Sequence, residues 1–194
     1  MNICLAEKKD ALEVAKTHKE EIKNGFLSSF NTFFLRKFYE AIFSSKHSFC
    51  VVAKEGAAVI GFVSGVSNIN YFYKYFFRKH FFIFVPVFLP KIFNRSFVKK
   101  VFESVFYPQK TKGFPEPELL TFAVKREYQG RGIGKGLLRQ LIEEFKKRQI
   151  RVFKVLVGSE MNSVGFYKKN GFQVVKEINL HGDEKSLVLI YKIK

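Results

Sequence analysis

Two spacings of apolar residues alternate along the chain, and each change of spacing marks the boundary of a predicted element. Helical spacing predicts helices near residues 10–25, 31–44 and 133–148, with a short helix at 162–170. Compact apolar runs between charged residues, Gly or Pro predict strands near residues 2–6, 50–53, 58–65, 118–124, 151–158, 172–180 and 185–193. This order predicts an α/β fold with a mixed central sheet flanked by helices.

Residues 68–112 break this pattern. The stretch contains eleven Phe, four Tyr and nine Lys or Arg residues, but a single acid, Glu103. Its composition predicts a helical insertion of two or three short helices, interrupted at Pro86 and Pro90 because proline lacks the backbone N–H that a helix needs. Because aromatic and basic residues alternate within it, the insertion is also a candidate surface for an anionic partner.

The composition limits the class of protein without selecting a partner. A chain of 194 residues with 47% apolar residues is long enough for one domain with a packed core. The net charge of +17 suits an anionic partner such as nucleic acid, a membrane surface or a phosphorylated ligand. Lys and Phe are abundant throughout the chain, however, so a general compositional bias explains the charge equally well.

The cysteines and histidines argue against a disulfide scaffold and against a metal site. Cys4 and Cys50 lie in strand-like apolar context and are expected to be buried thiols. The four histidines are scattered, so we expect them at the surface rather than as metal ligands. The N-terminal segment lacks the apolar core of a signal peptide, and the longest apolar run, 81–90, is half the length that spans a bilayer. A cytoplasmic protein is therefore expected.

The most informative stretch is YQGRGIGKGLLRQL, residues 128–141, in which glycines occupy every second position from Gly130 to Gly136. Glycine lets backbone N–H groups approach a ligand closely, and the start of a helix adds unpaired donors and partial positive charge. The stretch therefore predicts a binding site for a phosphate group. It matches neither a P-loop, which needs Ser or Thr after Lys135, nor a GxGxxG dinucleotide motif. A tight turn that only packs a helix on the sheet is the alternative.

The pattern that does fit is Gln129-x-x-Gly132-x-Gly134, placed between a predicted strand and a predicted helix. At this motif the chain resembles the GNAT acetyltransferases, whose fourth strand and following helix bind the pyrophosphate of acetyl-CoA. Asn162 and the stretch FYKKNGF, residues 166–172, lie at the spacing that the family shows. The resemblance therefore rests on several separated motifs rather than on the glycines alone.

The resemblance covers the chain apart from residues 68–112, where the family usually has a short turn. It implies a single GNAT acetyltransferase domain over residues 1–194, with a GNAT-like mixed sheet and a helical insertion at 68–112. Its acetyl-CoA-binding core would span residues 118–175. Acetyl-CoA would be a cosubstrate, and no metal is implied.

The resemblance also assigns residues to an acetyl-CoA site. Backbone groups of Phe122 and Val124 would pair with the pantetheine arm, and N–H groups of the glycine turn would bind the pyrophosphate. The expected set is Phe122, Ala123, Val124, Gln129, Gly130, Arg131, Gly132, Ile133, Gly134, Lys135 and Asn162. Arg131 and Lys135 can equally be exposed basic side chains, and Asn162 can be the N-cap of a short helix.

Acetyl transfer to an amine needs a proton acceptor for the amine and gains from a proton donor for the departing thiolate. Tyr167, in a position where family members carry Tyr, is the expected donor; its alternative is a core aromatic residue. Glu118 opens a strand at the offset where the histone acetyltransferases carry their base, and partial burial at a sheet edge would suit that role. A solvated Glu118, the neighbouring Glu116 or a chain of waters are the alternatives.

The sequence thus predicts an acetyl-CoA-dependent N-acetyltransferase that transfers the acetyl group directly to a primary amine of an unidentified acceptor. Neither cysteine lies near the motif, which disfavours a covalent acetyl-enzyme. The alternative is a non-catalytic acyl-CoA sensor or a binding module at a membrane surface. Amino sugars, protein N-termini, lysine side chains, polyamines and antibiotics all stay open as acceptors, and so does the acyl-chain length.

The insertion at 68–112 ends beside the start of the fourth strand, so it is expected to wall the acceptor pocket. Its aromatic and basic residues also suit peripheral contact with the inner membrane surface. An extra helical layer or a dimer face is the simpler alternative, and monomer and homodimer both stay open. Nucleic acid binding is disfavoured, because no RNP-like or OB-like pattern is present.

Overall fold

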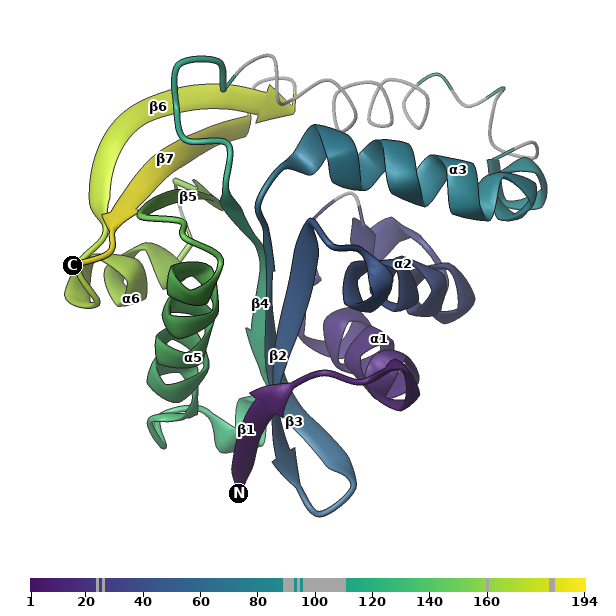
Figure 1. Cartoon of the computed structure of the whole chain (residues 1–194), viewed down its shortest axis with the longest axis horizontal. Helices are drawn as coiled ribbons and strands as arrows, with labels where there is room; N and C mark the ends of the chain where they lie inside the picture. The colour runs from purple at the N-terminus through teal and green to yellow at the C-terminus, as the bar shows by residue number, and fades with distance from the viewer. Residues whose placement is uncertain are drawn as a thin grey trace.

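The computed structural model of the chain describes residues 1–23, 25, 27–88, 93, 95, 111–159, 161–181 and 184–194. Its centre is a seven-stranded sheet with the strand order β1-β2-β3-β4-β5-β7-β6. Helices α1, α2 and α3 lie on one side of the sheet, and α5 and α6 lie on the other (Figure 1). The predicted α/β fold with a mixed sheet flanked by helices is confirmed.

The elements follow the predicted order, with small differences at their ends. The strands are β1 (Asn2–Leu5), β2 (Ser48–Glu55), β3 (Ala58–Val66), β4 (Glu118–Val124), β5 (Val152–Gly158), β6 (Gln173–His181) and β7 (Glu184–Lys192). The helices are α1 (Ala11–Glu21), α2 (Thr32–Ser44), α3 (Ile69–Phe88), α5 (Ile133–Lys147) and α6 (Ser163–Lys169). Neighbouring strands are antiparallel except for β4 and β5, which are parallel.

The sheet separates two apolar cores because successive residues of a strand point to opposite faces. Val52 of β2 and Phe62 of β3 enter the core beneath α1, α2 and α3. Their neighbours Val51 and Val63 enter the other core, beneath α5 and α6. The central strands are therefore apolar on both faces, which explains their nearly continuous apolar sequences.

Gly65 of β3 permits the closest packing in the second core. A Cβ atom at this position would lie 2.8 Å from the rings of both Phe49 and Phe145. Real Cβ atoms do not approach other heavy atoms so closely, so the two rings occupy the space of the missing side chain. The two rings themselves meet edge to face, with centroids 5.0 Å apart.

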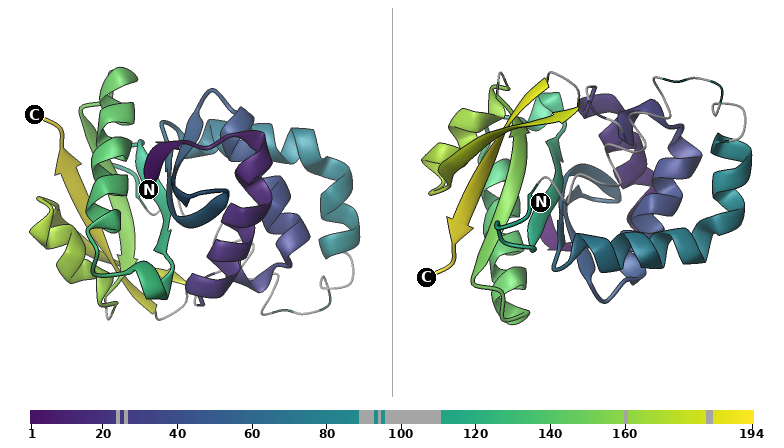
Figure 2. Two further views of the ribbon diagram at one scale, coloured as in Figure 1. Left: turned by 90° about the horizontal axis from the view of Figure 1, so that it is seen from below. Right: turned by 90° about the horizontal axis from the view of Figure 1, so that it is seen from above.

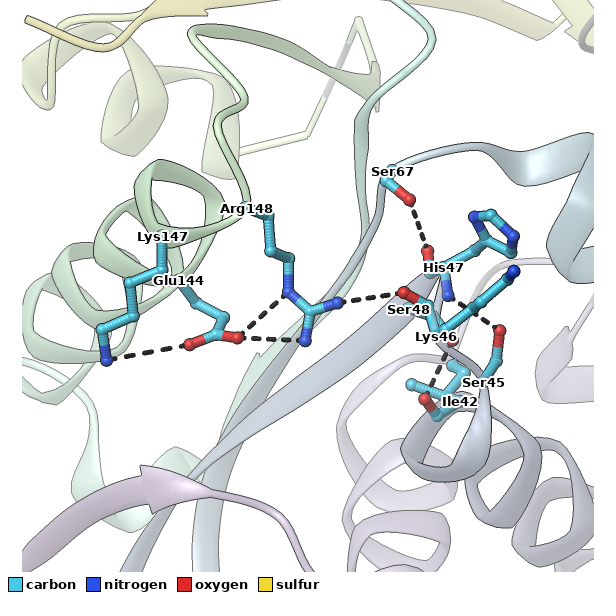
Figure 3. A network of polar contacts seen from close by, with 9 residues as sticks. All are labelled: Ile42, Ser45, Lys46, His47, Ser48, Ser67, Glu144, Lys147 and Arg148. Carbon is cyan, nitrogen blue, oxygen red and sulfur yellow. Dashed lines mark hydrogen bonds and ion pairs between the residues drawn. The ribbon is translucent and has the colours of Figure 1, made fainter.

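The C-terminal end of α5 is tied to the turn between α2 and β2 by polar contacts (Figure 3). The guanidinium of Arg148 donates to the carboxylate of Glu144 at 3.0 Å and to the backbone carbonyl of Lys46 at 3.2 Å. It also lies 4.7 Å from the centre of the Phe49 ring. The hydroxyl of Ser67 donates to the carbonyl of His47 at 3.2 Å, which fixes the same turn from the β3 side.

A chain of buried polar side chains crosses the first core from α1 to β4. The Nε2 atom of His18 lies 3.2 Å from the Ser28 hydroxyl, and its Nδ1 atom lies 2.6 Å from the Tyr39 hydroxyl. Tyr39 donates to Thr121 of β4 at 3.3 Å, and Thr121 lies 2.5 Å from the hydroxyl of Ser64. Each buried polar group thereby has a partner, as buried polar groups require.

The prediction that the histidines lie at the surface is wrong for His18. Its side chain shares the inner face of α1 with Val14, one helical turn earlier, and it is almost completely buried. Burial, reinforced by the charge of the adjacent Lys19, lowers the pKa of His18 to about 4. The imidazole is therefore neutral near pH 7 and can bond to both hydroxyls.

The insertion begins with α3, which packs on α2 and bends once. The bend lies at His80, where φ is −118° and ψ is 21°, and Figure 2 shows the helix turning there around the edge of the molecule. The helix continues past Pro86, so the predicted interruption at this residue is wrong. Pro90 and the further helices predicted up to residue 112 lie largely outside the described residues.

Candidate functional site

Strands β4 and β5 pair over two residues each, at the start of β4, and separate afterwards. Both strands are described in full, and their ladder consists of the pairs Glu118–Lys154 and Leu119–Val155. A bulge accompanies the separation: Gly65 of β3 pairs with Leu119 and Ser64 pairs with Thr121, which leaves Leu120 as an extra residue in β4. The carboxyl ends of the two parallel strands thus form a wedge that opens toward the start of α5.

The bulge decides which backbone groups of β4 face this wedge. The N–H of Lys125 donates to the carbonyl of Ile60 in β3 at 2.9 Å, so the backbone of residue 125 is directed away from β5. Hydrogen-bonding directions alternate along a strand, so the backbone groups of Phe122 and Val124 are directed toward β5. The side chain of Gln129 donates to the carbonyl of Val124 at 2.8 Å and thereby ties the following turn to the strand.

The glycine turn combines left-handed backbone with free donors. Gly130 and Gly132 have φ angles of 75° and 80°, a region that other residues rarely adopt. A Cβ atom at either position would meet no atom within 4 Å, so this side of the turn is open. Gly132 is the N-cap of α5 and supplies no side chain to cap it. Among the described residues, none accepts a hydrogen bond from the backbone N–H groups of residues 130–135.

Of the next two glycines, only Gly136 is required by packing. A Cβ atom at Gly134 would lie 3.5 Å from the ring of Phe166 and 3.7 Å from that of Phe122, an ordinary contact distance. At Gly136 it would lie 2.7 Å from the Cδ1 atom of Ile3, which is too close. The alternating glycines therefore have two structural roles, one in the backbone of the turn and one beneath the first turn of α5.

Two of the predicted cofactor residues give this turn positive charge. Arg131 and Lys135 are both exposed, and the guanidinium of Arg131 lies 5.4 Å from the centre of the Tyr128 ring. Tyr128 in turn donates to the carboxylate of Glu55 at 2.8 Å. Ile133 is buried and anchors the start of α5 in the core.

Tyr167 of α6 lies across from Phe122 of β4. Their ring centroids are 6.4 Å apart, and Phe166 and Phe172 pack against Tyr167 at 5.5 Å and 5.1 Å. Burial among these rings raises the pKa of the Tyr167 phenol well above its usual value of 10. The phenol therefore keeps its proton throughout the physiological pH range.

Asn162 lies at the N-cap position of α6, but its side chain makes no capping hydrogen bond. The side chain is exposed. The side-chain amide of Asn162 therefore does not cap the short helix, which was the alternative role for this residue.

Glu118 lies inside the sheet at the closed end of the wedge, not at a sheet edge as expected. Its carboxylate is 3.3 Å from the ammonium group of Lys154, its partner in the β4–β5 ladder, and both side chains are buried. Lys154 also donates to the carbonyl of Pro115 at 2.5 Å. Sequence reasoning missed Lys154, although a lysine in the middle of the apolar run VFKVLVG is a visible signal of a buried partner.

The described part of the chain holds neither a metal-binding cluster nor a membrane-spanning helix. No group of three or more His, Cys, Asp or Glu residues in it could hold a metal ion. None of the described helices is both long enough and apolar enough to cross a membrane.

The acetyltransferase (GNAT) family model matches residues 19–172, which is most of the chain. The chain belongs to the GNAT acetyltransferase family. It is thus an N-acetyltransferase by family, and the predicted family is confirmed. No curated protein sequence matches the chain.

Solved structures with the same fold span nearly the whole GNAT chain. An N-acetyltransferase from Staphylococcus aureus Mu50 aligns with a TM-score of 0.65 and 16% identity, covering 100% of this chain and 98% of its own. The ribosomal-protein-S18-alanine N-acetyltransferase from Escherichia coli aligns with a TM-score of 0.62 and 13% identity, covering 100% and 94%. The PaiA N-acetyltransferase from Thermoplasma acidophilum, solved in complex with coenzyme A, aligns with a TM-score of 0.55 and 18% identity, covering 99% of both chains.

Proposed function

We propose that this GNAT enzyme transfers the acetyl group of acetyl-CoA directly to a primary amine of its acceptor, in a complex that holds both substrates. The observation that carries the proposal is the wedge between β4 and β5. One side of the wedge offers backbone groups of β4 that no strand pairs with, and its open end meets the free N–H groups at the start of α5. An extended chain that ends in a pyrophosphate matches both features.

In this proposal the pantetheine arm lies along β4 as an additional strand. The backbone groups of Phe122 and Val124 bond to its amides, with Ala123 between them directed to β3. The pyrophosphate accepts hydrogen bonds from the N–H groups of residues 130–135, where the helix dipole favours negative charge. Arg131 and Lys135 add positive charge, and the exposed amide of Asn162 bonds to the pantetheine arm.

The chemistry is nucleophilic attack by the neutral amine on the thioester carbonyl. A C–N bond forms, the C–S bond breaks, and the amine nitrogen loses one proton. The phenol of Tyr167 donates a proton to the departing thiolate of coenzyme A. Burial keeps the phenol protonated at neutral pH, so its O–H can hydrogen-bond to the sulfur as the C–S bond breaks.

We propose Glu118 as the group that takes the proton from the amine. Its carboxylate lies at the closed end of the wedge, where β4 and β5 begin to separate. Lys154, 3.3 Å away, balances its charge in the buried site. Glu116, the weaker candidate, already accepts a hydrogen bond from Asn68 at 2.5 Å.

Calorimetric titration with acetyl-CoA tests the cofactor site. Gly134→Glu places a carboxylate in the first turn of α5, where Cβ has ordinary packing distances and an acid does not disfavour the helix. We expect wild-type binding and an affinity at least about tenfold lower in the variant, because the carboxylate repels the pyrophosphate. Gln140→Glu is the matched control: it adds the same charge to α5 farther along the helix and should bind as the wild type does.

Turnover on a panel of primary amines then separates the two function classes. Release of coenzyme A that depends on the amine supports the acetyltransferase. Tight binding of acetyl-CoA without turnover on any amine would instead favour the acyl-CoA sensor. Equal binding by the wild type and the Gly134→Glu variant would contradict the proposed pyrophosphate site.

A further inference from the structure

Helix α3 is held firmly by one of its faces. Ile69, Phe72 and Phe76, spaced three and four residues apart, are almost completely buried. The ring of Phe76 meets those of Phe34 and Phe38 of α2 edge to face, with centroids 5.9 Å and 5.3 Å apart. The inner face thus belongs to the core, and the orientation of the opposite face is fixed.

The opposite face carries aromatic and basic side chains in solvent. We call it the docking face; it consists of Tyr71, Lys74, Arg78, Phe81 and Phe82. Tyr71 is 56% exposed, Phe81 61% and Phe82 87%. Tyr71, Lys74 and Arg78 are three and four residues apart and share one side of the helix before the bend at His80, and the exposed rings of Phe81 and Phe82 follow directly after the bend. Exposed aromatic side chains gathered on a folded domain indicate a site that binds a partner.

The charge of this region has one sign. Residues 69–82 contain Lys74, Arg78 and Lys79 and no acid. Glu40 of α2 acts on His80 of α3, but its carboxylate is already bonded to Arg36 at 2.9 Å and to Lys37 at 2.8 Å. The partner of the docking face must therefore be anionic.

We infer that the docking face binds the anionic surface of a lipid bilayer. The rings of Phe81 and Phe82 would enter the headgroup region, and Lys74 and Arg78 would contact the lipid phosphates, as in helices that lie in the plane of a membrane. A second copy of the chain fits poorly, because a symmetric contact would bring two basic faces together with no acid in residues 69–82 to balance them. RNA fits poorly too, because Phe81 and Phe82 pack edge to face on each other at 5.7 Å instead of forming a stacking platform.

This inference does not depend on the proposed function, because membrane binding needs neither acetyl-CoA nor turnover. It would place the active site at a membrane and restrict the acceptors to amines available there, on lipids, lipid-linked sugars or membrane proteins. Helix α3 lies along the outside of the molecule in both views of Figure 2.

The test is sedimentation with vesicles at physiological salt. The wild-type protein should co-sediment with vesicles of phosphatidylcholine that contain about a quarter of phosphatidylglycerol. It should not co-sediment with vesicles of pure phosphatidylcholine. Phe81→Ser with Phe82→Ser, and separately Lys74→Glu with Arg78→Glu, should each lower vesicle binding at least about tenfold. All four side chains are exposed, so these variants should fold, which circular dichroism and acetyl-CoA binding would verify.

Matched controls lie on α5 and α2. Arg139→Glu with Lys146→Glu makes the same change of charge on exposed positions of α5, and Phe33→Ser removes an exposed ring from α2. Both should sediment with vesicles as the wild type does.

Three results would overturn the inference. The first is no binding of the wild type to the anionic vesicles, and the second is an equal loss of binding in docking-face variants and controls. The third is a switch from dimer to monomer, or a loss of affinity for a single-stranded RNA oligonucleotide, in the Phe81→Ser, Phe82→Ser variant while its vesicle binding is unchanged.

Discussion

The ammonium group of Lys154 lies 3.3 Å from the carboxylate of Glu118, and the two buried side chains join β4 to β5 at the point where these strands separate. A buried ion pair is costly to break from one side, because the remaining buried charge loses its counter-charge. We expect Lys154→Met to lower the free energy of unfolding by about 3–5 kcal/mol. The double variant Lys154→Met, Glu118→Leu should recover most of this loss. Urea unfolding of the single and double variants measures both effects, and equal stability of the two would contradict this account.

The same pair allows a catalytic role of Glu118 to be separated from a structural one. If Glu118 accepts the amine proton, Glu118→Gln should lower kcat by about 100-fold or more and remove its acid limb from the pH–rate profile. The affinity for acetyl-CoA should stay unchanged. Glu116→Gln is the control, and its kcat and pH–rate profile should equal those of the wild type. An unchanged profile in Glu118→Gln, with only the stability reduced, would leave Glu118 as the partner of Lys154 alone.

The buried imidazole of His18 predicts a loss of stability in acid. Burial lowers its pKa in the folded protein to about 4, whereas it titrates near 6.5 in the unfolded chain. Between these values the unfolded chain binds a proton that the folded chain does not, so stability falls as the pH decreases from about 6.5 to about 4, by up to about 3 kcal/mol.

Replacement of the imidazole isolates this effect from the carboxylates. His18→Gln keeps a polar group beside Tyr39 but cannot take up a proton in this range. Its free energy of unfolding, measured by urea at several pH values, should change less between pH 7 and pH 4.5 than that of the wild type. Parallel curves for the two proteins would show that His18 does not titrate as its burial predicts.

Tyr167→Phe tests the proposed proton donor. The variant keeps the ring packing against Phe122 and Phe172, so its fold and acetyl-CoA affinity should be preserved. We expect kcat to fall about 100-fold. Because the pKa of the phenol is raised, Tyr167 should contribute no alkaline limb to the wild-type rate below pH 10. Tyr191→Phe, which alters another half-buried tyrosine beside Phe172, should keep the wild-type kcat.

Gly65→Ala tests the close packing over β3. The added methyl group would lie 2.8 Å from two phenyl rings, and the rings must move to admit it. We expect a loss of about 1–3 kcal/mol in the free energy of unfolding. Gly165→Ala, in α6, has no atom within 4 Å of the new Cβ and should be neutral or stabilising by up to about 1 kcal/mol. A stable Gly65→Ala protein would mean that the rings can rearrange without cost.

The sequence predicted those parts of the fold whose causes are local. The turn between the strands predicted at 50–53 and 58–65, the start of α5 at Ile133 and the end of α6 near residue 170 depend on glycine conformations and on apolar spacing within one element. All three agree with the structure. The glycine turn could likewise be located because its chemistry is contained in a dozen consecutive residues.

What the sequence could not indicate depends on register and on distant partners. The Glu118–Lys154 pair joins strands separated by a helix, and no periodicity within either strand specifies which residues face each other. The buried position of His18 depends on Tyr39 and Ser28, from two other segments, which satisfy both of its ring nitrogens. The bulge at Leu120, which directs Phe122 and Val124 toward β5, depends on pairing with β3.

The short junction between β4 and β5 also has a consequence for the lifetime of the protein. Two residue pairs form the ladder between the two halves of the sheet, so beyond them the β4 amides that face the wedge have no partner strand to protect them from exchange with solvent. A cofactor that filled the wedge would link both halves, and its binding energy would add to the free energy of unfolding in proportion to the logarithm of its concentration. The cell's supply of acetyl-CoA would then govern how long each molecule resists heat and proteases, as well as how fast it works.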